Sequence, residues 1–472
     1  MSFFTNVPLS RRFQLLRSSF LQRDGLPFAD VLPEEQIQAV FNAEGVHFAQ
    51  AEEYVYTPAV TLWALLSQML FKGEQRSCLA AVSRVVVLLV ALGRQPPSDN
   101  TGDYCRARAK LPERVIRRLT LDTAARLEQA VPVSWLWRCR HVKLVDGTTA
   151  TAADTPQNRA VWPQLSAQAP GLGFPMLRIV VLLSLATGML CGMAEGPCVG
   201  KETGEMALFR QLLEQLSRGD IVLADRYYCS YFMIALLQDM GVDVVTRLHQ
   251  ARESDFRRGQ RLGPGDHLVT WLRPERTEWM DAETYARMPA TLTLREVKVE
   301  VHEPGFRTEG FVVVTTLRDS RWYTRDDIAA LYRKRWLVEL DIRAIKDTLG
   351  LDILRCKSPE MVRKELWAGL LAYNLLRQVI AQSAAQQGVA PRRVSFAATM
   401  QKVAAGWCLL PLCDQQLAVQ IAAAHLRHLA THEVGHRPNR IEPRAVKRRP
   451  KPHALLMQPR AEARAALLAG KA

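Results

Sequence analysis

The sequence predicts an α/β protein in which a core of alternating strands and helices is flanked by helical regions and interrupted by a β-rich segment. Three observations lead to this fold class. Apolar residues recur at helical spacing before about residue 130, apolar strands then alternate with amphipathic helices, and strand-like runs follow one another from about 251 to 315. Such alternation is typical of an α/β sheet. At 472 residues the chain is expected to hold roughly two to four domains.

The elements follow in order along the chain. TPAVTLWALLSQMLF and RSCLAAVSRVVVLLVAL predict N-terminal helices. HVKLVD predicts the first strand, MLRIVVLLSL and MLCGMA a hairpin, and DIVLAD and VDVVTRL two strands around a helix. The segment 251–315 has strand patterns without a long helix. A helix is then expected to begin at Thr324, where TRDD is a candidate capping box, and to run to about residue 349.

The chain is strongly basic, which favours a polyanionic partner. It has 62 Lys and Arg against 47 Asp and Glu, a net charge of +15 and a pI of about 9.6. Nucleic acid is the usual partner of such a chain, although the charge could serve solubility alone. Residues 437–460 contain eight Lys or Arg, one Glu and five Pro. This composition predicts an extended basic arm rather than a packed core.

Cysteine usage and the apolar runs indicate a reducing, aqueous compartment. The nine cysteines form no CxxC pair and no zinc-ligand pattern, so reduced thiols are expected. The longest apolar run, IVVLLSLATGMLCGM, has 15 residues, which is short for a membrane span and is better explained by two strands and a turn. We therefore expect a cytoplasmic protein.

Two aspartates stand where the predicted strands end. Asp146 closes VKLVD and is followed by GTT, and Asp225 closes IVLAD and is followed by RYY. Ligands of open α/β sheets usually bind at the carboxyl ends of the strands. Either aspartate taken alone is more often a helix cap or a turn former.

A third acid, Glu339, lies in the stretch YRKRWLVELDIRAIK among basic and phenolic groups. At 100° per residue, a regular helix brings Tyr332, Arg335, Glu339 and Lys346 within about 60° of one another. A solvated helix face with salt bridges would explain this row. The other explanation is a carboxylate that binds a metal ion beside a phosphate backbone.

Three carboxylates from two strands and a helix suit one particular chemistry. Mg²⁺ or Mn²⁺ prefers oxygen ligands and usually binds through a few carboxylates and the substrate phosphate. Two such ions, about 3.5–4 Å apart, can activate water or a 3′-OH and stabilise the leaving oxygen. Arg and Lys one or two turns away could then bind neighbouring phosphates.

These residues resemble the motifs of the DDE transposases of the IS4 family of bacterial insertion sequences. Tyr332, Arg335, Glu339 and Lys346 match that family's Y-(2)-R-(3)-E-(6)-K signature, and VDGTT and LADRYY resemble the blocks that carry its two aspartates. On that resemblance, Asp146, Asp225 and Glu339 form the catalytic, metal-binding triad. The implied cofactor is Mg²⁺ or Mn²⁺, with two ions in each active site.

The resemblance implies an RNase H-like catalytic core with a β-rich insertion between the second Asp and the Glu. It divides the chain into five parts. These are a helical DNA-binding region at 1–130, the core at 131–250 and 316–400, the insertion at 251–315, and C-terminal helices with the basic arm at 401–472.

The implied activity is excision and insertion of an insertion sequence by phosphoryl transfer: end hydrolysis, a hairpin intermediate and strand transfer. The implied partners are the terminal inverted repeats and target DNA, bound by a homodimer that associates with the nucleoid. DNA contacts are implied for Tyr332, Arg335, Lys346, Arg226, Tyr227, Arg247 and Arg252. A nuclease without strand transfer and a non-catalytic, transposase-derived DNA-binding protein are the alternatives.

A flipped base in a hairpin needs an aromatic surface on which to stack. Family members can carry a Trp just before the strand that leads to the Glu helix, and Phe311 holds that position here. Phe311 is therefore the base-stacking candidate. Trp271, Trp279 and Trp322 are nearby aromatics for which a core role is the more common one.

Overall fold

The computed structural model describes residues 12–49, 51, 53–300, 310–434 and 455–470. The chain divides into two compact units. We call residues 1–139, 183–192 and 339–434 the helical unit, and residues 140–182, 193–338 and 435–472 the sheet unit. Most of the predicted basic arm at 437–460 lies outside the described residues, since residues 435–454 are not described. The five-part division expected from the resemblance stays a prediction.

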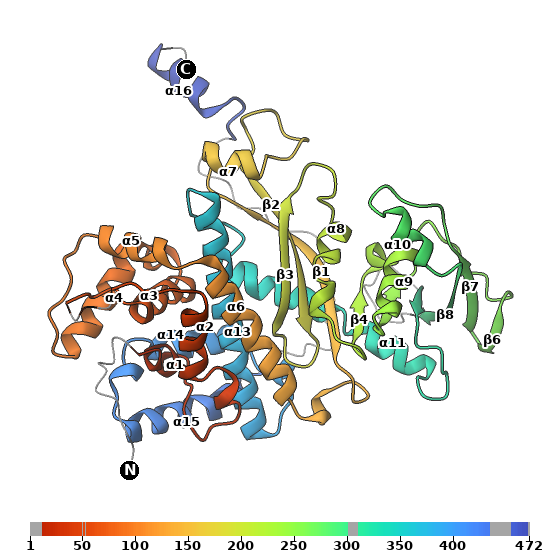
Figure 1. The fold of residues 1–472 in the computed structure, drawn as a ribbon, viewed down its shortest axis with the longest axis horizontal. Helices are drawn as coiled ribbons and strands as arrows, with labels where there is room; N and C mark the ends of the chain where they lie inside the picture. The colour runs from red at the N-terminus through yellow and green to blue at the C-terminus, as the bar shows by residue number, and fades with distance from the viewer. Residues whose placement is uncertain (1–11, 50, 52, 301–309, 435–454, 471–472) are drawn as a thin grey trace. The chain divides into compact units, whose positions relative to one another are not determined.

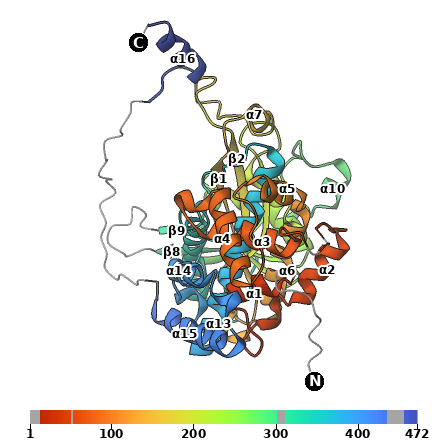
Figure 2. The ribbon, with the colours of Figure 1, turned by 90° about the vertical axis from the view of Figure 1, so that its left-hand side faces the viewer.

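The helical unit is organised around one long helix, α13 (Pro359–Gln387), in which every residue from Lys364 to Ala384 is buried. A helix that is buried on all sides has to be enclosed by others, and α13 contacts α3, α6, α14 and α15 (Figures 1 and 2). The helices of this unit are α1 (Gln14–Ser19), α2 (Glu34–Ala43), α3 (Pro58–Leu70), α4 (Cys78–Ala91), α5 (Gly102–Lys110), α6 (Glu113–Ala130), α13, α14 (Phe396–Gly406) and α15 (Gln415–Thr431).

Local signals explain where these helices begin. Thr57 and Ser77 cap α3 and α4 by accepting hydrogen bonds from the backbone N–H groups of Val60 and Ala80. Both helices were predicted from their apolar spacing and are confirmed. Among the buried polar groups, Asp341 is only 1% exposed and pairs with the guanidinium groups of Arg377 and Arg392.

The described residues form one nine-stranded sheet in the order β3-β2-β1-β4-β5-β9-β8-β7-β6. Its strands are β1 (Val142–Thr151), β2 (Met176–Ser184), β3 (Leu190–Pro197), β4 (Ile221–Ala224), β5 (Asp243–Arg247), β6 (Gln260–Gly263), β7 (Asp266–Leu272), β8 (Thr291–Glu300) and β9 (Gly310–Thr315). β1, β4 and β5 are parallel. The order β3-β2-β1-β4-β5 with this parallel trio is that of an RNase H-like core, so the predicted α/β class is confirmed.

The β-rich segment extends this sheet rather than forming a second one. β9 pairs antiparallel with β5, and β8, β7 and β6 follow outward from it. Figure 1 shows β7 and β6 at one side of the sheet unit and β1, β2 and β3 at the other. β8 is described to Glu300, and residues 301–309 lie outside the described part.

Short helices complete the sheet unit. They are α7 (Pro156–Val161), α8 (Glu205–Arg210), α9 (Tyr231–Asp239), α10 (Ala282–Arg287), α11 (Arg325–Arg333), the beginning of α12 (Trp336–Arg343) and α16 (Arg460–Leu468). α9 packs on β5, and α11 contacts β5, β8 and β9. The capping box predicted at Thr324 is present and begins α11. Within the described residues, no helix is both long enough and apolar enough to cross a bilayer.

Two predictions about element boundaries were wrong. β1 does not end at Asp146 but continues to Thr151, because the two threonines after Gly147 are β-branched and favour a strand over a turn. The helix expected from Thr324 to about 349 is not regular either. Hydrogen bonds between residues three apart tighten it at Lys334 and Arg335, and Ala344–Thr348 forms a π-helix.

Candidate active site

Asp146 and Asp225 occupy equivalent positions on two neighbouring parallel strands. The register pairs Leu144 of β1 with Leu223 of β4, and each aspartate lies two residues further along its own strand direction. β4 ends at Ala224, so the prediction that Asp225 closes its strand is confirmed. On β1 the residues become more exposed from Asp146 onward. The register therefore sets both aspartates at the same level of the sheet, where β4 ends and β1 continues to Thr151.

Each aspartate is held by local hydrogen bonds. Asp146 Oδ1 accepts from the Gly147 N–H at 2.8 Å. Asp225 Oδ1 accepts from the Tyr227 N–H at 2.8 Å, which caps a 3₁₀ turn at Arg226–Tyr228. The Thr246 hydroxyl donates to the Asp225 carbonyl oxygen at 2.6 Å. These bonds fix the backbone around both carboxylates.

The surroundings of Asp146 disfavour its charge. Burial raises the pKa of this carboxyl group from 3.8 to about 6, and the nearby charges of Asp225 and Glu205 raise it further, while the Gly147 N–H and Arg335 oppose the rise. Arg335 Nη1 lies 3.7 Å from Asp146 Oδ2, with both side chains 20% exposed. Burial is thus the main reason why ionisation of Asp146 is disfavoured, and Arg335 compensates for it only in part.

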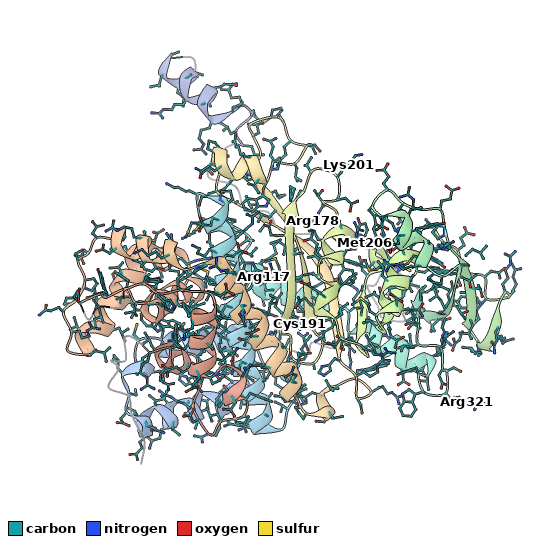
Figure 3. The ribbon with its side chains drawn as sticks, viewed as in Figure 1. Arg117, Arg178, Cys191, Lys201, Met206 and Arg321 are labelled. Atoms are coloured by element: carbon teal, nitrogen blue, oxygen red, sulfur yellow. The ribbon has the colours of Figure 1, made fainter. Side chains whose placement is uncertain are left out.

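Glu205 is a third acid of this region, and the sequence analysis missed it. It is the first residue of α8, and burial raises its pKa, as does the charge of Asp225, while Arg178 and a hydrogen bond from Tyr228 lower it. Figure 3 shows Arg178 on β2 and Met206 on α8. The sequence TGEMALF does not place Glu205 at the end of a predicted strand, nor beside other candidate functional residues on one face of a helix.

The aromatic rings of Tyr332 and Phe311 pack against each other near Asp225. Their ring centroids are 5.1 Å apart, and the guanidinium of Arg247 lies over the Phe311 ring at 5.3 Å. Tyr332 is only 7% exposed, and burial raises its pKa to about 12, against the opposing influence of Arg335 and Arg247. Tyr332 is thus mainly a packed side chain, whereas Phe311 is half-buried.

The other predicted contacts differ in accessibility. Arg226 and Tyr227 are exposed directly after Asp225. Arg252 lies with its guanidinium 3.9 Å from the centroid of Trp271, a core ring whose indole N–H donates to Glu296. Trp322, by contrast, is 59% exposed.

Glu339 and Lys346 lie further along the same chain segment, in the helical unit. Glu339 is in the first turn of α12 and Lys346 is within the π-helix. Since a π-helix does not turn by 100° per residue, the regular-helix calculation does not place Lys346 on the predicted row. Glu339 follows Arg335 by four residues across the tightened turn.

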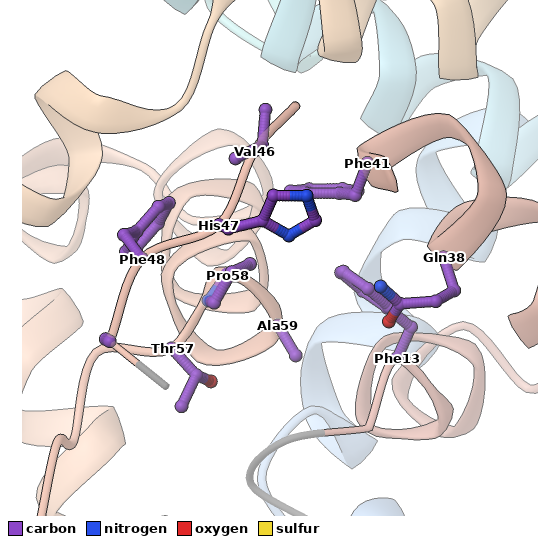
Figure 4. A pocket seen from close by; sticks show the side chains of 10 residues that line it. Phe13, Gln38, Phe41, Val46, His47, Phe48, Thr57, Pro58 and Ala59 are labelled. Atoms are coloured by element: carbon purple, nitrogen blue, oxygen red, sulfur yellow. The ribbon is translucent and has the colours of Figure 1, made fainter. Parts of the chain in front are cut away.

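A pocket of about 170 Å³ in the helical unit has a different character. It is lined by Phe13, Gln38, Phe41, Val46, His47, Phe48, Ala49, Thr57, Pro58 and Ala59 (Figure 4). These residues include no carboxylate, so the pocket lacks the ligands that Mg²⁺ requires. The pair of aspartates in the sheet unit is the better candidate for phosphoryl-transfer chemistry.

Comparison with known proteins matches part of the chain to a family model. Residues 137–375, about half of the chain, match the family model described as the transposase DDE domain, and both aspartates and Glu339 fall within them. The chain belongs to the DDE transposase family. The family's catalytic chemistry depends on divalent metal ions.

Individual relatives of this DDE transposase support the predicted IS4 relationship. The chain is 30% identical over 299 residues to the transposase InsG of the insertion sequence IS4 from Escherichia coli (strain K12), covering 62% of this chain and 64% of InsG. It is 36% identical over 74 residues to the transposase of IS421 from Escherichia coli, which is 16% of this chain and 20% of the relative. The chain thus spans less than two thirds of either relative.

A solved structure, the cryo-EM structure of the piggyBac transposase synaptic complex with hairpin DNA, is also similar. It aligns with a TM-score of 0.41 and 10% sequence identity, covering 89% of this chain and 86% of that one.

The side chains of the site supply some, but not all, of the ligands expected for a divalent cation. Within the described residues, no group of three or more His, Cys, Asp or Glu is arranged to hold a metal ion. Asp146 and Asp225 nevertheless supply the oxygen donors that Mg²⁺ and Mn²⁺ prefer. The raised pKa of Asp146 marks a carboxylate whose charge is poorly compensated, and a bound cation would relieve this.

Proposed function

We propose that this DDE transposase excises and inserts an insertion sequence by metal-dependent phosphoryl transfer on DNA. The observation that carries the proposal is the register of β1 and β4, which sets Asp146 and Asp225 at equivalent strand positions within the region that matches the family. The net charge of +15 agrees with a DNA substrate.

We propose Glu339 as the third carboxylate of the site. Arg335, four residues earlier, contacts Asp146, so the chain enters α12 from the neighbourhood of the first aspartate. Two Mg²⁺ ions, when bound by these acids, would activate the attacking water or 3′-OH and stabilise the leaving oxygen. The hydrogen bonds from Gly147, Tyr227 and Thr246 hold the aspartates ready for this role.

Basic and aromatic side chains around the acids would position the DNA. Arg335 is placed to exchange its contact with Asp146 for a phosphate once cations neutralise the carboxylate. Phe311, which contacts both Tyr332 and Arg247, is proposed as the surface on which a flipped base stacks in a hairpin intermediate. The remaining proposed DNA contacts are Arg226, Tyr227, Arg252 and Lys346.

The proposed substrates are the terminal inverted repeats of the element and a target DNA. A homodimer would hold the two ends together, as the family resemblance implies. A nuclease would stop after hydrolysis of the ends, so joined products distinguish the two activities.

The test is incubation of the purified chain with Mg²⁺ and DNA that carries the sequences flanking its own gene. Wild type is expected to give nicked ends, hairpins and strand-transfer products. Asp225→Asn should retain DNA binding in a gel-shift assay and lose at least about 10³-fold in cleavage rate. The matched control is Asp239→Asn, because Asp239 is an exposed aspartate at the end of α9.

Cleavage by Asp225→Asn at the wild-type rate would refute the assignment of this aspartate. DNA binding by wild type without any metal-dependent cleavage would instead support the non-catalytic alternative.

A further inference from the structure

Glu205 of α8 lies between the segments that follow the two aspartates. We infer that Glu205 is a positioning residue, which fixes the backbone after Asp146 and the turn after Asp225 relative to each other. This inference rests on the proposed function, because it gives Glu205 a role only if those aspartates are catalytic.

The first contact is with Gly147, the residue directly after Asp146. A Cβ atom at position 147 would lie 2.3 Å from Glu205 Cδ and 2.4 and 2.7 Å from its carboxylate oxygens. Gly147 does not have a left-handed φ, so its backbone conformation would accept any residue. The absence of a side chain at position 147 lets the Glu205 carboxylate lie directly against β1, and a methyl group there would require the end of the Glu205 side chain to move.

The second contact is with Tyr228, which ends the turn that Asp225 caps. The Tyr228 hydroxyl lies 3.4 Å from Glu205 Oε2, and its ring packs edge-on against Phe209 with centroids 5.5 Å apart. Tyr228 is only 2% exposed. Since Phe209 is also in α8, this short helix holds Tyr228 at two points and Gly147 at a third.

The segment before α8 is itself anchored to the sheet. Arg178 Nη1 of β2 donates to the Thr203 carbonyl oxygen at 2.8 Å, and Arg178 is the cation that acts on Glu205. Strands β2, β1 and β4 are neighbours in the sheet. The segment that precedes Glu205 is therefore held by β2, and Glu205 itself contacts the segments after both aspartates.

Two other roles for Glu205 explain less. As an acid in the first turn it could merely stabilise α8, but that would not require a glycine at position 147. It could also be a metal ligand, but that role would not account for its contacts with Gly147 and the Tyr228 hydroxyl. Contact with the backbone after one aspartate and with the turn after the other is the arrangement expected of a positioning residue.

The test combines four variants of the full chain: Glu205→Ala, Glu205→Gln, Gly147→Ala and the double variant Glu205→Ala/Gly147→Ala. The readouts are the single-turnover rate constant of end cleavage at saturating Mg²⁺ and the Kd for Mn²⁺ of the DNA-free protein. Glu202→Gln is the matched control. Glu202 lies three residues before Glu205, and it is an exposed acid that pairs with Arg210.

Glu205→Ala and Gly147→Ala are each expected to slow cleavage by about 10- to 100-fold and to weaken Mn²⁺ binding, since small displacements of catalytic groups are costly. Glu205→Gln, which keeps the shape and one acceptor oxygen, should lose no more than about fivefold. In the double variant, truncation of Glu205 leaves room for the methyl group added at position 147. Gly147→Ala should therefore cost far less in the Glu205→Ala background than alone.

Each outcome decides one question. Additive effects in the double variant, or a loss in Glu205→Gln as large as in Glu205→Ala, would overturn the positioning role. A lower melting temperature with unchanged rate constant and Mn²⁺ Kd would also overturn it and leave Glu205 as structural. If Gly147→Ala does not fold, Tyr228→Phe removes the second contact alone and should slow cleavage several-fold, and no loss there refutes the inference.

Asp225→Asn separates this inference from the proposed function. If Asp225→Asn is inactive while Glu205→Ala cleaves normally, only the inference fails. If Asp225→Asn cleaves normally, the proposed function fails with it.

Discussion

Replacing Asp146 by Asn should stabilise the metal-free protein while abolishing its chemistry. A carboxyl group whose pKa is raised by folding stabilises the fold below its ordinary pKa, and this contribution is lost as the pH rises through the raised value. For Asp146 the loss extends from about pH 4 to slightly above pH 6. At pH 8 the folded protein therefore holds an ionised carboxylate in surroundings that disfavour it.

The size of the effect follows from the pKa. Folding raises the pKa of Asp146 from 3.8 to about 6, and each unit of pKa corresponds to roughly 1.4 kcal/mol. At pH 8 the ionised Asp146 therefore destabilises the metal-free fold by about 3 kcal/mol. At pH 4.5 the same relation gives only about 1 kcal/mol. The side chain is 20% exposed, so solvent screens little of this cost. Asn has a similar shape and no charge, and it should recover most of the difference.

Differential scanning calorimetry in the presence of EDTA would measure this difference in stability between wild type and Asp146→Asn. The transition of the sheet unit in Asp146→Asn should shift upward by about 5–10 °C at pH 8 and by much less at pH 4.5. Asp239→Asn should stay within about 0.5 kcal/mol of wild type at both pH values. Added Mn²⁺ should stabilise wild type and not the variant. An Asp146→Asn protein that is less stable than wild type at pH 8, or equally shifted at both pH values, would refute the reasoning.

Three further changes test other parts of the molecule. Asp341→Asn leaves the buried guanidinium groups of Arg377 and Arg392 without their anion, and urea unfolding should show a loss of about 3–5 kcal/mol in the helical unit. Thr324→Ala removes the capping box of α11 and should cost about 1 kcal/mol, seen as faster hydrogen exchange in its first turn. Phe311→Ala should reduce hairpin products by about 10-fold with DNA binding retained, as expected for a lost stacking surface, and an unchanged hairpin yield would exclude Phe311.

The sequence could predict the parts of the site that local patterns encode. The apolar runs before Asp146 and Asp225 predicted two strands, and their parallel register places the two aspartates at the same level, although β1 continues past Asp146. Thr324 was identified as a cap because its capping box is local. The helix irregularities could not be predicted, since the tightened turn at Arg335 and the π-helix around Lys346 leave no mark in apolar spacing.

Glu205 shows why the rest of the site needed the structure, and also which signal could have revealed it. Its partners lie 58 residues before it and 23 after it in the sequence, so no spacing rule connects them. The sequence predicts that the first strand ends at Asp146, just before Gly147. Once β1 is known to continue through it, a glycine inside a strand calls for another explanation, and close approach of another group is the usual one. A glycine next to a candidate catalytic acid, in a stretch whose neighbours favour a strand, therefore predicts that another part of the chain packs against that acid's backbone. Because Gly147→Ala would force Glu205 away, the restriction at Gly147 should be lifted when Glu205 is truncated, and the double variant measures that dependence directly.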